Sequence, residues 1–363
     1  GNASGLGAAS ASVTVQSGGS LDLNGMNVTN TNALSLTGSG IGSGTSATGA
    51  LTNSDTTNTN GANYSGDVTL SANSSIGGVG NINLYGKLGG TYSLYKVGYG
   101  TLSLYGASSE YTSSISIKLG KIKVATEGAL GANDIVYLNG GTSAADYGVL
   151  DVNGYSLSKS FTISGGSNIT NSSASAVTLS GGITLGSKYG VITANSGSGE
   201  INLTGLVTAS SAVSLTLAGD GRINVSGNSL ADNGATALGI TIGTSGSKGT
   251  VYFDHIANTY TGATKISGGT LIVSEAAALS ALSTLNSGGS NTDNSVLMLT
   301  SASDYQMNAL SVGGNLTINT TGGTSAIVFN ALTGNGITGS NNKVFGVGSG
   351  VTATVTGDFL LNG

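Results

Sequence analysis

The chain of 363 residues contains no cysteine, no proline and no tryptophan. Without cysteine it can form neither a disulfide bond nor a thiolate metal site, and cysteine-free chains are common among bacterial surface proteins, which cross an oxidising compartment. Without proline every residue can donate a backbone hydrogen bond, which suits strands that have ladder partners on both sides. A compositional bias of the organism is the alternative explanation for the missing proline.

Charged residues are scarce as well, at 7 % of the chain, and the net charge is −5. Such a chain lacks the basic footprint of nucleic-acid-binding proteins, so we expect no nucleic-acid partner. No apolar run approaches the roughly 18 residues that a membrane-spanning helix needs, so we expect no transmembrane segment. With 38 % hydrophobic residues the chain is nevertheless too apolar to resemble a disordered one, and we expect it to fold.

Glycine is abundant, with 63 residues, and it bounds a recurring module of the form Gly-x-apolar-x-apolar-x-Gly. The module occurs at 80–86, 100–106, 199–205 and 221–227. Alternation with period 2 is typical of short strands with one buried face and one wet face. The spacing between neighbouring modules, from 80 to 100 and from 199 to 221, suits one coil of a solenoid with glycine at its corners. We predict an all-β parallel β-helix (β-solenoid) of roughly 16 coils.

One longer unit occurs twice, at residues 100–130 and 249–279, with no gap between the aligned copies. Units of this size cannot bury an apolar face alone, so they stack on their neighbours. The alternation predicts that eight residues point into the core: Leu102, Leu104, Ile122, Val124, Val251, Phe253, Leu271 and Val273. It predicts greater exposure for four of their strand neighbours: Ser103, Lys121, Tyr252 and Ile272.

The second copy resembles the autotransporter-associated β-strand repeat, which occurs in passenger domains of bacterial autotransporters and related surface proteins. It reads Thr-Tyr-Thr-Gly at 259–262 and Ile-Ser-Gly-Gly-Thr-Leu-Ile-Val at 266–273. The first copy keeps several of these motifs but has Ser113 and Lys121 where the repeat has Gly and Thr. The resemblance covers the two copies and no more of the chain. It implies a right-handed parallel β-helix outside the cell, and it implies no particular activity.

The first 65 residues are the most polar part of the chain and carry no aromatic residue before Tyr64. Their strand-like segments, 11–15 and 20–23, are too short to hold their position alone. They need either the next coil or a neighbouring subunit, and we expect strand addition to a neighbour, with 351–355 as the receiving edge. We therefore divide the chain into a polar, strand-rich N-terminal segment, 1–65, and a continuous β-solenoid, 66–363.

Candidate catalytic and metal-binding residues are few. His255 is the only histidine, and adjacent strand residues point to opposite faces, so it cannot pair locally with Asp254. The carboxylates are dispersed along the chain, unlike the clustered carboxylates of polysaccharide-cleaving β-helices. The segment 77–81 is only a weak match to calcium-binding turns. We expect no catalytic residue, no metal and no cofactor, and we do not expect an enzyme.

The most promising surface is a group of tyrosines. Six of the fourteen lie close together in sequence: Tyr85, Tyr92, Tyr95, Tyr99, Tyr105 and Tyr111. Tyr85 and Tyr105 hold the same place in the modules 80–86 and 100–106, so they can stack as an exposed row. Aromatic rows bind glycans or partner subunits; packing beneath a loop is the alternative. Three nearby lysines, Lys118, Lys121 and Lys123, form a small basic patch that can also be simple edge protection.

These features predict a non-catalytic structural protein located outside the cell or on the bacterial cell surface. In this interpretation the chain is a β-solenoid subunit of a self-assembling fibre, filament or layer, joined head to tail or laterally to copies of itself. The first alternative is an adhesin passenger domain that binds a host or neighbouring-cell ligand, with cell-surface glycans among the possible partners. A polysaccharide-active β-helix enzyme is the second alternative.

Overall fold

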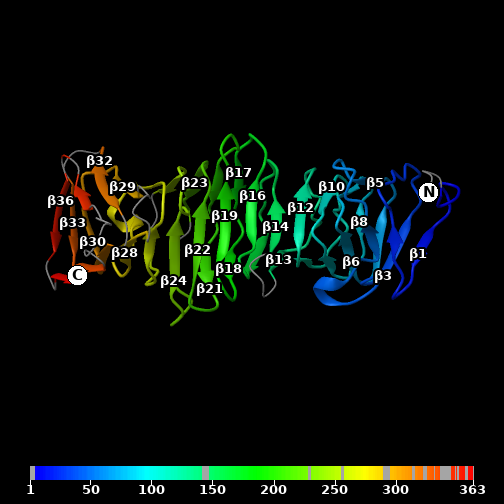
Figure 1. Cartoon of the computed structure of the whole chain (residues 1–363), viewed down its shortest axis with the longest axis horizontal. Coiled ribbons are helices and arrows are strands. Elements are labelled where there is room, and N and C mark those ends of the chain that lie inside the picture. The colour runs from blue at the N-terminus through cyan, green and yellow to red at the C-terminus, as the bar shows by residue number, and fades with distance from the viewer. Residues whose placement is uncertain are drawn as a thin grey trace. The chain divides into compact units, whose positions relative to one another are not determined.

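The structure is a computed structural model, which describes residues 5–140, 147–227, 230–254, 257–288, 295–312, 315–321, 325–330, 332–335, 345–347, 349, 351–355 and 359–362. Short strands dominate it, and all described pairings between the named strands are parallel (Figure 1). The chain divides into two compact units. Unit 1 comprises residues 1–155 and 159–170, and unit 2 comprises residues 156–158 and 171–363.

Unit 1 contains two parallel sheets and a short 3-10 helix, η1 (Gly44–Ser46). The first sheet follows the order β1 (Val13–Val15), β3 (Leu34–Gly38), β6 (Val68–Gly78), β9 (Leu94–Lys96), β11 (Ile115–Ile117), β13 (Ile135–Asn139) and β15 (Ser160–Ser164). Three further strands join it: β2 (Leu21–Asp22), β4 (Leu51–Asn53) and β8 (Leu88–Gly89). The second sheet follows the order β5 (Ala62–Tyr64), β7 (Ile82–Leu84), β10 (Thr101–Leu104), β12 (Gly120–Val124), β14 (Gly148–Asp151) and β16 (Asn168–Asn171).

Unit 2 repeats this plan and contains a second 3-10 helix, η2 (Ala276–Ala278). One long sheet follows the order β19 (Gly190–Ala194), β22 (Val213–Ala218), β24 (Leu238–Ile242), β26 (Thr264–Ile266), β28 (Thr284–Ser287), β31 (Ala309–Val312), β34 (Leu332–Asn335) and β37 (Phe359–Asn362). Another follows the order β17 (Val177–Leu179), β20 (Ile201–Leu203), β23 (Arg222–Val225), β25 (Thr250–Phe253), β27 (Thr270–Val273), β29 (Ser295–Leu299), β32 (Leu316–Thr320) and β35 (Phe345–Val347). The remaining strands are β18 (Ile183–Leu185), β21 (Val207–Ala209), β30 (Asp304–Met307), β33 (Ser325–Phe329) and β36 (Val351–Val355).

The predicted fold class is confirmed, because the parallel strands stack as successive turns of a β-solenoid. The turns number about 13, fewer than the roughly 16 expected from the module spacing. Coil length varies more than the modules suggest. Leu102 lies beside Ile82, which follows the module spacing, whereas Val149 lies beside Lys121, a longer step along the chain. Loops between strands add residues to a coil without adding a rung, so the count falls.

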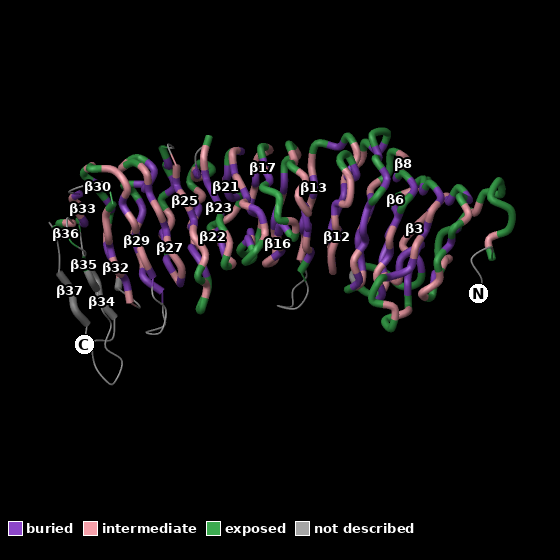
Figure 2. Tube along the Cα trace, turned by 90° about the horizontal axis from the view of Figure 1, so that it is seen from above, coloured by how far each residue is buried: buried purple, intermediate pink, exposed green. Residues whose placement is uncertain are grey.

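The core is built as the alternation predicts. All eight residues assigned to it are buried, with at most 4 % of each exposed. Buried and half-buried residues alternate along strands such as β13 and β29 (Figure 2). Ser103 is more exposed than Leu102 and Leu104, at 7 % against 1 % and 2 %, as predicted, but it is still a buried residue. Its register partners are Asn83 and Lys123, and these longer side chains lie on either side of the small hydroxymethyl group.

The two aligned copies adopt the same order of elements. In the first copy β10, β11 and β12 follow one another, and in the second copy β25, β26 and β27 do so. Tyr111 and Tyr260, which align with each other, are both fully buried beneath their loops. The Ala-Leu corner is buried in both copies as well. The repeat in the sequence is therefore a repeat of one packed unit, present once in unit 1 and once in unit 2.

The short N-terminal strands are held by the chain's own coils. Val13 and Val15 of β1 pair with Leu34 and Leu36 of β3, and Leu21 of β2 pairs with Leu51 of β4. The next coil therefore supplies ladder partners for this segment, and strand addition to a neighbouring subunit stays a prediction. The boundaries at residue 65 and the continuity of 66–363 stay predictions.

A column of glycines turns one corner of unit 1. Gly78, Gly98 and Gly120 have φ angles of 118°, 68° and 70°, a region that L side chains rarely adopt. A Cβ on Gly98 would lie 2.3 Å from the carbonyl oxygen of Gly78, and one on Gly120 would lie 2.4 Å from that of Gly98. Each coil can approach the previous one here only because no side chain is present, which explains why glycine recurs at the coil spacing.

The two sides of β27 provide a test of the inward assignment. Leu271 is fully buried, and its neighbour Ile272 is only partly buried. We expect Leu271→Asp to lower the free energy of unfolding by at least about 3 kcal/mol, because it buries an unpaired carboxylate. Ile272→Asp, the matched control, should cost less than about 1 kcal/mol. Urea denaturation of both variants measures the difference, and equal stability of the two would contradict the assignment.

Candidate interaction surface

Four of the six predicted tyrosines lie on the surface of unit 1. Tyr85, Tyr92, Tyr99 and Tyr105 are 41–62 % exposed. Tyr85 and Tyr105 stack as predicted, with ring centroids 4.6 Å apart and an angle of 16° between the rings. They directly follow β7 and β10, which are adjacent strands, so the coil spacing itself brings the rings together.

The other two tyrosines do not extend this surface in the predicted way. The ring of Tyr95 lies under the ammonium group of Lys118, at 4.3 Å, in a cation–π contact. Tyr111 is fully buried, so the prediction that it belongs to the interaction surface is wrong. Its hydroxyl donates to the carbonyl of Ser114 at 2.8 Å and accepts the backbone N–H of Leu94 at 2.9 Å. Burial raises the pKa of Tyr111, whose role is to pin the loop before β11.

The remaining sequence candidates do not form a site in the structure. His255 lies outside the described residues. The segment 77–81 begins in β6 and continues through the glycine corner described above. Within the described part of the chain, no group of three or more acidic or histidine side chains could hold a metal ion.

A polar cluster on unit 2, which the sequence did not reveal, surrounds the only arginine of the chain. The Arg222 guanidinium lies 3.8 Å from the centre of the Tyr252 ring and 3.4 Å from a Glu200 carboxylate oxygen. Arg222 also donates to the side chain of Asn224 at 2.7 Å. Asn224 in turn donates to Glu200 at 2.9 Å and to Asn202 at 2.7 Å. These bonds connect three adjacent strands, β20, β23 and β25, so the cluster acts as a clamp across their outer face.

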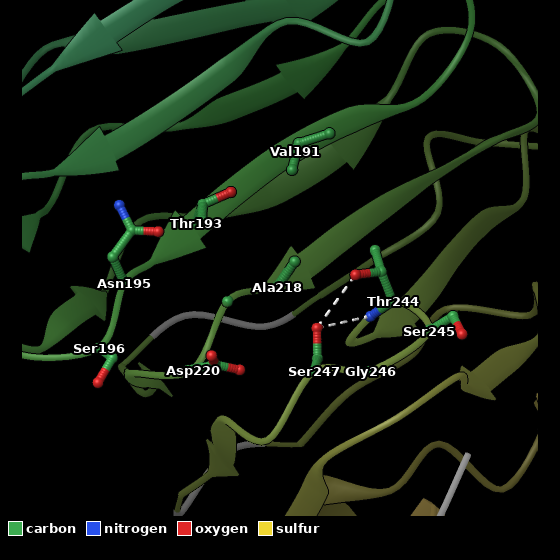
Figure 3. Close-up of a pocket in the computed structure, with 11 residues that line it drawn as sticks. Val191, Thr193, Asn195, Ser196, Ala218, Asp220, Thr244, Ser245, Gly246 and Ser247 are labelled. Carbon is green, nitrogen blue, oxygen red and sulfur yellow. Dashed lines mark hydrogen bonds between the residues drawn. The ribbon is translucent and has the colours of Figure 1, made fainter. Parts of the chain in front are cut away.

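Unit 2 also carries a groove of about 430 Å³ (Figure 3). It is lined by β19, β22 and the loop that follows β24, with Thr193, Asn195 and Asp220 among its polar side chains. The loop is closed by Ser247, whose hydroxyl accepts the backbone N–H of Thr244 at 3.0 Å. Asp220 accepts the backbone N–H of Lys248 at 2.8 Å. The lining is polar, and its carboxylate already ties two coils together.

Lys96 is the most perturbed titratable residue of unit 1. It occupies an inward position of β9 and is 1 % exposed. Its ammonium group donates to the carbonyls of Val97, Gly98 and Leu119 at 2.8, 2.7 and 3.1 Å. Burial lowers the pKa of Lys96 to about 7. A hollow of about 300 Å³, lined in part by Gly98 and Leu119, opens beside this carbonyl cage. The sequence did indicate that Lys96 is buried, because the alternation along β9 assigns position 96 to the core.

Comparison with known proteins yields no assignment: no family model, no curated protein and no solved structure matches the chain. None of the described helices has the length and apolarity needed to cross a membrane. The fold defines the class of the molecule as a β-solenoid protein. The resemblance to the autotransporter-associated repeat stays a prediction.

The buried amine predicts a pH dependence of stability. Between the folded pKa of about 7 and the unfolded value of 10.5, the unfolded chain binds one more proton than the folded chain. The free energy of unfolding should therefore rise with pH across this window, by at most about 1.4 kcal/mol per pH unit. Lys96→Met should remove this slope, because methionine does not titrate. Urea denaturation at about pH 7.5, 8.5 and 9.5 measures it.

The matched control is Lys121→Met, which removes a half-exposed lysine from the neighbouring sheet and should leave the slope intact. A Lys96→Met protein with the wild-type slope would show that the amine does not titrate in this window.

Proposed function

We propose that this chain is a non-catalytic structural protein of the bacterial cell surface or extracellular space, a β-solenoid subunit that assembles into a fibre, filament or layer. One observation carries the proposal: side-chain carboxylates and amides are used as ties between successive coils. Groups that would otherwise be available for chemistry instead hold the stack together.

The carboxylates support this interpretation in both units. Asp67 accepts the backbone N–H of Lys87 from the next coil at 2.8 Å. Asp22 accepts both the hydroxyl and the backbone N–H of Ser54, at 2.6 and 3.0 Å. In unit 2, Asp232 accepts the Thr261 hydroxyl at 2.7 Å. Burial, the largest single cause, acts to raise the pKa of Asp232, but the hydrogen bonds that it accepts together outweigh burial and lower the pKa. A carboxylate held in such bonds fixes the geometry of the loops that it joins.

Amides form ladders with the same effect. Asn83 donates to Asn63 at 2.8 Å on unit 1, and Asn224 donates to Asn202 at 2.7 Å on unit 2. In each pair the two residues are register partners on adjacent parallel strands. Stacked amides of this kind stabilise repetitive parallel sheets. A scaffold whose coils are hydrogen-bonded to one another on the surface, as well as packed together in the core, is suited to a mechanical role.

Strand edges are the contact by which such scaffolds can join. A parallel sheet presents unpaired main-chain donors and acceptors at its edge, and these pair with another strand unless they are blocked. Among the described strands β1 pairs only with β3. The N–H of Val13 donates to the carbonyl of Ala33. Because successive N–H groups of a strand point in opposite directions, the N–H of Thr14 points away from β3 and is suited to receive a second chain.

The adhesin alternative has its own supporting observation, the exposed Tyr85–Tyr105 pair. Aromatic side chains that are 47 % and 41 % exposed present apolar area that a binding partner can cover. A structural role and a binding face are compatible, since assembly uses strand edges and binding uses an outer face.

The assembly proposal predicts uniform fibres in negative-stain electron microscopy of the purified chain. Thr14→Pro removes the outward N–H without removing a bond to β3, so it should shorten or abolish the fibres and leave the circular dichroism spectrum unchanged. Thr14→Ala keeps the N–H and is the matched control. Wild-type protein that remains as single particles at high concentration would contradict assembly, and fibres of normal length from Thr14→Pro would exclude β1 as the joint.

A further inference from the structure

The outer face of unit 1 carries an interruption in its tyrosine row. Three residues occupy equivalent places on adjacent coils, because Tyr85, Tyr105 and Ala125 each donate a backbone N–H to the last residue of the preceding strand in the sheet. Tyr85 covers one face of the Tyr105 ring. On the other side the equivalent residue is only alanine, so no third ring stacks there. The phenol of Tyr155, one coil further, reaches the carbonyl of Ala125 at 3.2 Å. The row is thus an aromatic pair followed by a gap, a position that carries only a methyl group, with the Tyr155 hydroxyl bonded to the backbone at that position.

Two lysines project from the strand that leads into this gap. Lys121 and Lys123 lie on β12 shortly before Ala125, and all three positions share the outward face because side chains alternate along a strand. Both lysines are half-buried, so their stems lie along the sheet while the ammonium groups reach solvent. The one carboxylate in register with them is Asp151, which is 2 % exposed and accepts the Asn153 N–H at 3.1 Å. Glu127 is exposed at the corner beyond the gap.

We propose that this face binds an acidic glycan, a sugar chain that carries carboxylate or sulfate groups. The face of a sugar ring presents C–H groups, which pack against an open aromatic ring such as the far side of Tyr105. Ammonium groups form charge-assisted hydrogen bonds to carboxylates and sulfates. A face that places two cations beside an aromatic gap is complementary to a ligand with both features. This inference is independent of the assembly proposal, because it uses an outer face rather than a strand edge.

The experiment separates sugar from charge with three probes and the whole chain. Polygalacturonate has both sugar rings and carboxylates, its methyl ester has the rings without the charge, and polyglutamate has the charge without the sugar. Affinity electrophoresis or titration calorimetry should show binding of polygalacturonate that weakens as salt screens the charges. The methyl ester and polyglutamate should each bind at least about tenfold more weakly.

Substitutions locate the site. Tyr105→Ala, and Lys121→Gln combined with Lys123→Gln, should each weaken polygalacturonate binding by about tenfold or more. The matched controls are Tyr189→Ala and Lys265→Gln, which remove an exposed tyrosine and an exposed strand lysine of unit 2 and should change nothing. Circular dichroism checks that every variant is folded. The proposal is overturned if polygalacturonate does not bind, if either partial probe binds equally well, or if the controls lose binding as much as the unit 1 variants.

Discussion

Everything in this structure depends on one constraint: each residue of a coil lies directly against its register partner in the coil before. Parallel, in-register pairing places equivalent positions of successive coils one above another, so their side chains form columns. The residues of one column must pack against one another from each coil to the next. The corner column at Gly78, Gly98 and Gly120 shows the strictest case, where a carbonyl oxygen occupies the place of a side chain. Inward columns accept leucine, isoleucine and valine because these fill the same space in each rung.

The same constraint explains which features could be predicted from the sequence. Alternation identified the inward residues of both copies, since a strand with one buried face permits only one register. It did not identify Tyr111, because that residue lies in a loop where period 2 carries no information, although its alignment with Tyr260 indicated a shared packing role. The number of turns could not be predicted either, because loop length is independent of strand pairing. Lys96 was missed because a charged residue is rarely assigned to a core, even where the alternation places it there.

The two copies show that geometry is kept where sequence is not. The carbonyl of Tyr111 accepts the backbone N–H of Ala132, which directly follows Gly131, at 2.7 Å. At the place of Gly131 the second copy has Ser280, whose hydroxyl donates to the carbonyl of Tyr260 at 2.6 Å. A backbone donor in one unit is replaced by a side-chain donor in the other, and the buried carbonyl is satisfied in both. What the repeat preserves is therefore the requirement to pair a buried polar group, rather than the residue that does so.

Columns also determine where a surface of this kind can become a site. Where two register partners are alike, as Asn63 and Asn83 are, one side chain bonds to the next and less bonding capacity is left for a ligand. Where the residue type changes from one coil to the next, the row of like side chains ends, and the last side chain of the row keeps one face uncovered. The step from Tyr105 to Ala125 is such a change, and it lies beside lysines on the same outer face of β12. In a repetitive scaffold the functional information thus lies in the departures from the repeat, because the repeat itself is devoted to stability.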